Sequence, residues 1–186
     1  MKHTSNDLRV RRTLKLIRDA FYEMVLENNY NEISITDLAE KATINRKTFY
    51  LHYSSLDDLI QEIEQEIADE ILDIISEDIE NLDIKGCIGA FYRYLDNSNR
   101  VQKKLFCDTS YHIFDEGVMD LILDSDKISS LFDKTAHPEI VRTYSLSITY
   151  IYRDWVTGES NTSLDELIDY ASQLVTYGYS GIIPQK

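Results

Sequence analysis

ITDLAEKATINRKTFYLHY, the stretch Ile35–Tyr53, decides the fold of this chain. Its apolar and small side chains recur where two short helices that cross at a steep angle must touch, at Leu38, Ala39, Ala42, Ile44 and Phe49. Ala39 is the tightest of these positions, since a larger side chain would push the second helix away from the first. The polar side chains between them suit a major groove: Asn45, Arg46, Lys47, Thr48, Tyr50 and His52. This pattern predicts a DNA-binding helix-turn-helix.

The second helix of the motif is expected to run from Arg46 to about His52 and to enter the DNA. Its N-terminal residues, including Lys47 and Thr48, lie at the end that reaches base edges in helix-turn-helix docking. Arg or Lys can make paired bonds to a guanine edge, and the methyl group of Thr48 can pack on a thymine. Tyr50 and His52 are expected to donate to phosphate oxygens, which position the protein without reading sequence.

Three polar residues have the pattern of helix N-caps. Ser34 and Ser163 are each followed three residues later by an acid, as in a capping box, and Asn45 precedes the second helix of the motif. Ser34 and Thr36 are also candidates for phosphate contacts, and the sequence does not decide between a cap and a contact.

A basic helix is predicted before the motif, over Leu8–Glu27. An apolar stripe at helical spacing marks it, at Leu14, Ile17, Ala20, Phe21, Met24 and Val25. Its first half is basic, through Arg9, Arg11, Arg12, Lys15 and Arg18. A solvated charged face is the alternative for any one of them. As a cluster beside the motif they are expected to include phosphate contacts, and Arg9, Arg11 and Arg12 are the residues we assign to that role.

Charge is distributed unevenly along a chain whose net charge is −14. Residues 1–56 hold nine Lys/Arg and seven Asp/Glu, whereas residues 57–186 hold ten and twenty-six. Phosphate contacts are screened within about 10 Å, so a distant acidic body does not abolish DNA binding. It should instead orient the approach with the basic end first.

Composition predicts an all-α protein, because only 6 Gly and 2 Pro occur among 186 residues. A long helix from about 57 to 83 carries twelve Asp/Glu and no Lys/Arg, and is expected to connect a head to a second domain. Further helices are predicted at 84–96, 100–107, 111–124, 127–134, 138–158 and 164–178. The predicted domains are a three-helix DNA-binding head, residues 1–56, and a larger helical bundle for ligand binding and dimerisation, residues 57–186.

Several other classes of protein are disfavoured. No apolar run approaches the roughly 20 residues that cross a bilayer, and the N-terminus lacks a signal-peptide core, so we expect a cytoplasmic protein. There is no phosphate loop, no G-x-S-x-G elbow and no acid–base pair, which argues against an enzyme and against a bound cofactor.

Metal and redox sites are not expected either. The spacing of His112, Asp115 and Glu116 would allow a metal on a helix, but solvent-exposed polar residues are the simpler interpretation. Cys87 and Cys107 form neither a disulfide framework nor a metal spacing, and we interpret them as small buried hydrophobes, with a redox switch as the alternative.

Aromatic residues are plentiful in the second domain. The candidate lining of a ligand pocket is Tyr92, Phe106, Tyr111, Phe114, Tyr144 and Trp155. Aromatic stripes at helical spacing more often form a core or a dimer interface, and that alternative stays open.

The first 60 residues resemble the TetR family of bacterial transcriptional regulators, whose head ends in a motif like G-V-S-x-x-x-L-Y-Y-H-F followed by an acidic helix start. Here residues 43–53 read TINRKTFYLHY, and residues 56–59 read LDDL. Two departures stand out. Thr43 replaces the turn glycine, and Leu56 replaces a lysine that commonly contacts phosphate. The N-terminal arginines are candidates to substitute for that lysine.

The resemblance implies a homodimer formed through the last two long helices. Its recognition helices would enter successive major grooves of a near-palindromic operator about 34–36 Å apart. A small-molecule effector would shift the spacing of the two heads, and repression is the family's usual output. The stretch Tyr150–Gly158 is similar to a subgroup that includes regulators of dihydroxyacetone kinase operons. This adds an alternative in which a protein coregulator docks on the second domain and the chain acts as an activator.

Overall fold

The fold is all-α, as predicted, in a computed structural model that describes residues 8–132, 138–158 and 160–178. Those ranges contain ten α-helices and two 3₁₀ helices. The end of the predicted helix 127–134 lies outside the described residues. No helix in the described part of the chain is both long and apolar enough to cross a membrane.

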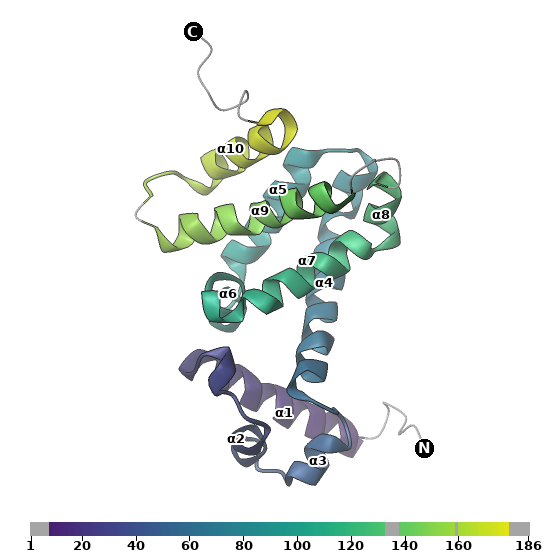
Figure 1. Ribbon diagram of the computed structural model, residues 1–186, viewed down its shortest axis with the longest axis vertical. Coiled ribbons are helices and arrows are strands. Elements are labelled where there is room, and N and C mark those ends of the chain that lie inside the picture. The colour runs from purple at the N-terminus through teal and green to yellow at the C-terminus, as the bar shows by residue number, and fades with distance from the viewer. Residues whose placement is uncertain (1–7, 133–137, 159, 179–186) are drawn as a thin grey trace.

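The head consists of the first four elements, which lie at one end of an elongated molecule (Figure 1). They are α1 (Leu8–Glu27), η1 (Tyr30–Glu32), α2 (Ile35–Lys41) and α3 (Arg46–Tyr50). The buried face of α1 is the predicted stripe from Ile17 to Val25. It packs against α2, and Lys41 of α2 bridges back to Glu23 and Glu27 of α1, with Nζ–Oε2 distances of 3.4 and 3.0 Å.

The body begins with a long helix, α4 (Leu56–Glu80), which runs from the head along the length of the molecule (Figure 1). The elements that follow are α5 (Ile84–Asn97), α6 (Arg100–Cys107), η2 (Thr109–Tyr111), α7 (His112–Asp124), α8 (Asp126–Phe132), α9 (Pro138–Thr157) and α10 (Leu164–Tyr177). Helix α4 packs against α5 and α7, and α10 packs against α5. Helices α9 and α10 thereby lie at the end of the molecule opposite to α3 (Figure 1).

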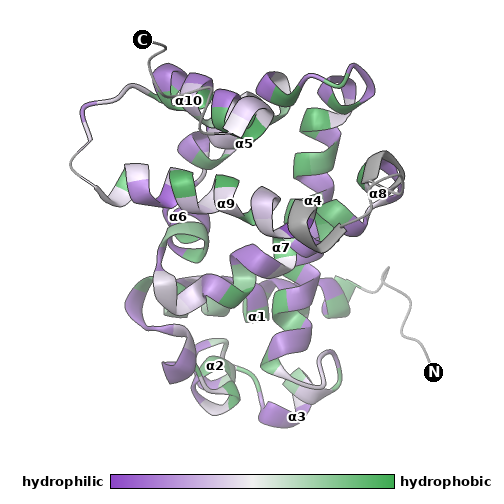
Figure 2. Cartoon of the chain, turned by 45° about the horizontal axis from the view of Figure 1, so that its top comes forward, coloured by the Kyte–Doolittle hydropathy of each residue, from purple (hydrophilic) through white to green (hydrophobic). Residues whose placement is uncertain are grey.

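Hydrophobic and hydrophilic residues alternate along α1, α4 and α7, as expected for helices that turn one face to the core (Figure 2). The apolar positions of α4 are buried from Leu59 to Ile79, while most of its acids stay on the solvent side. Helix α4 is therefore amphipathic, as its sequence predicts.

The predicted caps are present. Ser34 Oγ accepts a hydrogen bond from the amide of Asp37 at 3.1 Å, and Asn45 Oδ1 accepts one from the amide of Lys47 at 2.9 Å. Ser163 and Glu166 form the full capping box. Each bond satisfies an amide that the first helical turn leaves without a partner, which fixes where the helix begins.

The loops contain short helices that periodicity does not predict. The Asn28–Asn31 turn includes η1, where the Asn29 amide donates to Glu32 Oε2 at 2.8 Å. A second short helix, η2, precedes α7. Three-residue helices are too short for an apolar repeat, so only their capping side chains mark them in the sequence.

Candidate nucleic-acid interface

The turn between α2 and α3 is made without glycine. Thr43 adopts a left-handed backbone conformation with φ of 56°. The amide of Ile44 donates to the carbonyl of Ala39 at 2.9 Å, which closes the turn, and the Ala39 side chain is only 2% exposed. A β-branched residue in this region is strained, because its side chain crowds the backbone. The turn geometry is thus imposed by the contact between the two helices.

Helix α3 presents its polar residues outward from the end of the head. Asn45, Arg46 and Lys47 are exposed, and Tyr50 is 48% exposed. Neither Arg46 nor Lys47 has an acidic partner among the described residues. Thr48 and His52 are half-buried at the edge of this surface. The two cations nearest the start of α3 are therefore available to an external anion.

Aromatic packing anchors α3 to the rest of the head. Phe49 is fully buried, and its ring centroid lies 5.5 Å from that of Tyr53. Tyr53 is also buried and donates through its hydroxyl to Glu62 Oε1 at 3.0 Å. Leu56, which stands where the family has a lysine, packs half-buried against the core. It supports α4 from inside and offers no charge to a phosphate.

The basic residues of α1 divide into two groups. Arg18 binds Glu62 and Glu66 of α4 at 2.6 and 2.5 Å, so it joins two helices of the protein. Lys15 pairs with Asp19 within α1. Arg9, Arg11 and Arg12 are exposed on the first described turns of the helix. In the view of Figure 1 those turns lie on the same side of the head as α3.

Ser34 and Thr36 occupy the start of α2 differently. The hydroxyl of Ser34 accepts from the Asp37 amide and also donates to Asp37 Oδ2 at 2.6 Å, so its proton is already bonded within the cap. Thr36 is exposed on the first turn of α2.

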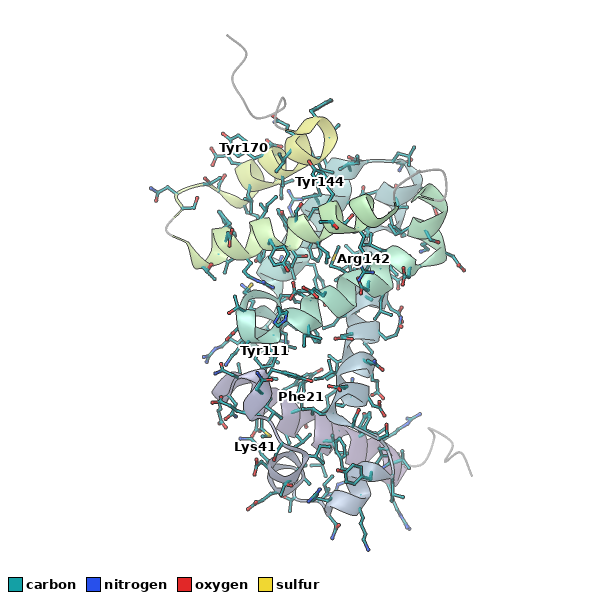
Figure 3. The ribbon with its side chains drawn as sticks, in the orientation of Figure 1. Phe21, Lys41, Tyr111, Arg142, Tyr144 and Tyr170 are labelled. Carbon is teal, nitrogen blue, oxygen red and sulfur yellow. The ribbon has the colours of Figure 1, made fainter. Side chains whose placement is uncertain are left out.

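The six aromatic residues predicted to line a pocket do not gather at one site. Tyr111 and Phe114 line a cavity of about 370 Å³ between the head and the body. Phe106 packs edge-on against Phe114 at 5.6 Å, one layer deeper. Tyr92 is buried elsewhere, where its hydroxyl donates to the carbonyl of Ile148 at 2.9 Å. Trp155 donates through its indole N–H to the carbonyl of Thr162 at 2.8 Å. The last of the six, Tyr144, is 39% exposed on α9 (Figure 3).

The interpretation of Asp115 as a solvent-exposed residue is wrong. Asp115 is 0% exposed, and Oδ2 lies 2.8 Å from Arg153 Nη2 on α9, itself 6% exposed. Arg153 also donates from Nε and Nη2 to the carbonyl of Phe106 at 3.1 and 2.9 Å. Burial raises the pKa of Asp115 to about 6, and the nearby guanidinium opposes that shift. No group of three or more His, Cys, Asp or Glu side chains suited to a metal occurs in the described residues.

A second buried acid, Glu64 on α4, is absent from the sequence-based candidates. It is 6% exposed and lines the cavity beneath Tyr111. A signal for it exists, since position 64 falls within the apolar stripe of α4, between Ile60 and Ile67. Cys87 and Cys107 are free and half-buried, and burial raises the pKa of both thiols, which disfavours the reactive thiolate.

Comparison with known proteins places this geometry among helix-turn-helix regulators. YxbF of Bacillus subtilis, an uncharacterised HTH-type transcriptional regulator, is 37% identical over 73 residues, which cover 39% of this chain and 19% of YxbF. DhaS of Lactococcus lactis, the HTH-type activator of the dhaKLM operon, is 27% identical over 123 residues, covering 63% of this chain and 64% of DhaS. The matches thus span less than two thirds of either relative. No family model matches the chain.

The fold comparison agrees. A TetR-family transcriptional regulator from Vibrio parahaemolyticus superposes with a TM-score of 0.55, at 14% sequence identity, covering 86% of this chain and 96% of its own. By fold and by sequence similarity, the chain is TetR-like and resembles helix-turn-helix transcriptional regulators, DhaS among them.

Proposed function

We propose that the chain is a sequence-specific DNA-binding transcriptional regulator that binds a near-palindromic operator as a homodimer. The observation that carries the proposal is the exposed surface of α3, where Arg46 and Lys47 have no acidic partner in the described structure. In a protein with net charge −14, unpaired cations at the tip of a helix-turn-helix are matched to phosphates and guanine edges. The regulators among its relatives support this function over a catalytic one.

Helices α9 and α10 are the proposed dimer interface. Large apolar side chains are exposed along both helices, including Tyr150 and Val156 on α9 and Tyr170 on α10, which is 55% exposed. Tyr170 lies at this end of the molecule in Figure 3, whereas Tyr144 lies between α9 and α10, where its hydroxyl donates to the carbonyl of Leu174 at 2.5 Å. Packing two copies across this surface would bury those groups. The two heads would then lie at the far ends of the dimer, free to contact successive major grooves.

Selection of bound sequences from a random DNA pool tests the proposal. The full-length protein should enrich a sequence with two related half-sites, because each head of a symmetric dimer reads one of them. Enrichment should sharpen as the salt concentration is raised, because salt weakens the non-specific binding that competes with it. A pool that stays random at every salt concentration would contradict the proposal.

The assignment of Arg9, Arg11 and Arg12 as phosphate contacts has its own test. Replacing all three by Ala should flatten the slope of log affinity against log salt concentration by about 0.9 for each phosphate of the duplex that is no longer neutralised. Lys15→Ala is the control, since its ammonium pairs with Asp19 within α1. An unchanged slope in the triple variant would exclude the three arginines from the interface.

The direction of regulation has two candidates. A small-molecule-responsive repressor is the first. The second is an activator controlled by a protein coregulator that docks on the body, and it is favoured by the 123-residue similarity to DhaS, an operon activator, which extends beyond the head. A reporter driven by the selected operator separates them, because deleting the gene raises expression for a repressor and lowers it for an activator.

A further inference from the structure

The cavity between the head and the body has an unusual lining. The head contributes Phe21 from α1 and Tyr30 from η1, and the body contributes Tyr111 and Phe114. Phe21 and Tyr111 face each other across the boundary between the two parts (Figure 3). The rings of Tyr30 and Tyr111 meet edge-on at 6.1 Å. At about 370 Å³ the cavity falls at the lower end of the range for small-molecule sites.

Carboxylates supply all of the charge in this lining. They are Asp57 and Glu64 from α4, and Glu116 and Asp120 from α7. No Lys, Arg or His side chain lines the cavity in the described part of the chain. Asp57 accepts from the Tyr30 hydroxyl at 2.5 Å, and Glu116 accepts from the Tyr150 hydroxyl at 3.3 Å. Two of the four acids thus have neutral donors within the protein.

The other two acids keep oxygens without a partner. Glu64 is 6% exposed and has no hydrogen bond or ion pair among the described residues. Its carboxyl lies against Gly117, where a Cβ would come within 2.6 Å of the Glu64 Cδ and Oε1 atoms. Asp120 pairs with Arg142 through Oδ2, but its buried Oδ1 has no partner. A buried carboxylate without a donor is costly, so it marks a place where an external donor is expected.

We propose that this cavity binds a small organic cation, an ammonium or amidinium that carries an apolar group. The cation would donate to Glu64, while its apolar part would contact the four aromatic rings. A divalent metal is disfavoured because the described residues hold no suitable ligand cluster, and a carboxylate ligand would be repelled.

Proton linkage supports the same assignment. Burial, followed by the negative charges of Asp120 and Asp57, raises the pKa of Glu64 to about 7. The other titratable groups that line the cavity are Tyr30, Tyr111 and Glu116. A bound cation stabilises the ionised carboxylate, so binding near neutral pH should release a proton from Glu64. Affinity should therefore be higher above that pKa than below it.

The position of the cavity gives the ligand a route to the head. The carbonyl of Asn28, just after α1, accepts from Tyr111 Oη at 2.9 Å and from Lys104 Nζ at 3.1 Å. A ligand bound between Tyr30 and Tyr111 would disturb these hydrogen bonds to Asn28 and shift the orientation of the head relative to the body. This effect on DNA rests on the proposed function, whereas the binding of the cation does not.

Calorimetric titration of the full-length, DNA-free protein tests the binding. The probes are phenethylamine, benzamidine and tetraethylammonium as cations, 2-phenylethanol and phenylacetate as neutral and anionic counterparts of phenethylamine, and Mg²⁺. We expect at least one organic cation to bind at millimolar concentration or below, with proton release that varies with the buffer, and its neutral and anionic counterparts not to bind. Failure of all three cations, equal binding of 2-phenylethanol, or binding of Mg²⁺ alone would overturn the proposal.

Two variants locate the site. Glu64→Gln should weaken cation binding by about tenfold or more, the usual effect of losing a charged hydrogen-bond partner. The control is Glu77→Gln, the same change on the exposed side of α4, which should leave affinity unchanged. Gly117→Ala should also weaken binding, because its new methyl displaces the Glu64 carboxyl. Unchanged affinity in Glu64→Gln would contradict the site even if cations bind. If cation binding holds while DNA selection fails, the proposed function is wrong and this site stands.

Discussion

The head and the body differ in which charges they leave without an internal partner. In the head, Arg46 and Lys47 on α3 are exposed cations without an acidic partner among the described residues. In the body the clearest case is a carboxylate, that of Glu64, which is buried where the body meets the head and has no partner among the described residues. In both parts, the charges that do have a partner hold helices together. Arg18 joins two helices in the head, and Arg153 joins two in the body.

This contrast separates structural charges from functional ones. A charge that the protein neutralises itself holds helices together, so its loss should be measured as a loss of stability. A charge that the protein buries without a partner costs stability, so its removal should stabilise the fold and weaken binding of an external partner. The sign of the stability change therefore distinguishes the two kinds.

The largest expected effect on stability belongs to the buried pair in the body. Asp115→Asn should lower the free energy of unfolding by about 3 kcal/mol, because it leaves Arg153 charged and buried without its counter-ion. The control is Asp165→Asn, which breaks the exposed contact with Arg93 and should cost less than about 1 kcal/mol. Chemical denaturation measures both. Equal stability of the two variants would contradict the distinction between the buried pair and the exposed one.

Glu64→Gln should change the free energy of unfolding in the opposite direction, by an amount that depends on pH. The folded protein holds the pKa of Glu64 at about 7, above the ordinary value of 4.5, so the folded state binds more protons between those values. Stability from this group is therefore full at low pH and is lost as pH rises through about 7. The variant escapes this loss and should be more stable above that pH by roughly 1–2 kcal/mol, allowing for solvent screening.

Thermal unfolding of Glu64→Gln and the parent protein across this pH range measures that difference. The gap in Tm should be small near pH 5 and should widen toward neutral and alkaline pH. The control is Glu77→Gln, the same change at an exposed position of α4. A variant that is less stable than the parent above the pKa of Glu64 would mean that the carboxylate has a partner within the protein.

The smallest expected effect comes from backbone strain. Thr43→Gly should raise the free energy of unfolding by about 1 kcal/mol, because glycine adopts a φ of 56° without crowding. This net value already allows for the greater freedom of glycine in the unfolded chain, which opposes the gain. Leu82, which follows α4 in the body, has a φ of 55° but is not β-branched. Leu82→Gly should therefore raise the free energy of unfolding by less than Thr43→Gly does. Denaturant titration ranks the two. A destabilised Thr43→Gly would show that the threonine side chain contributes more than its strain costs.

Helix positions were predictable from the sequence to a large extent. Periodicity and capping residues predict the end of α1 at Glu27 and both ends of α6, Arg100–Cys107, as observed. Helix caps are local interactions of three or four residues, so the sequence contains all the information that they need. The short helices η1 and η2 escaped prediction because they carry no apolar repeat.

The polar parts of the body were not predictable in the same way. Asp115 was expected to be exposed because it stands among polar neighbours, and only the approach of Arg153 from α9 explains its burial. Glu64 lies in an apolar stripe, but its lack of a partner depends on what α7 and η1 place around it. Such partnerships join residues far apart in the sequence, and a single sequence does not reveal them. The residues proposed to face DNA could be selected from the sequence alone, since they follow one another along α3.

Operator affinity measured by fluorescence anisotropy, on the DNA recovered by selection, tests the central claim most directly. The double variant Arg46→Ala/Lys47→Ala should lose about tenfold or more in affinity, since each base contact contributes roughly 1–3 kcal/mol. The control Lys85→Ala/Arg93→Ala removes two cations from the body, where both pair with acids of α10, and should bind as the parent does. Sedimentation should show the same oligomer for all three proteins. Undiminished operator binding by the double variant would contradict the assignment of α3 as the DNA-reading helix.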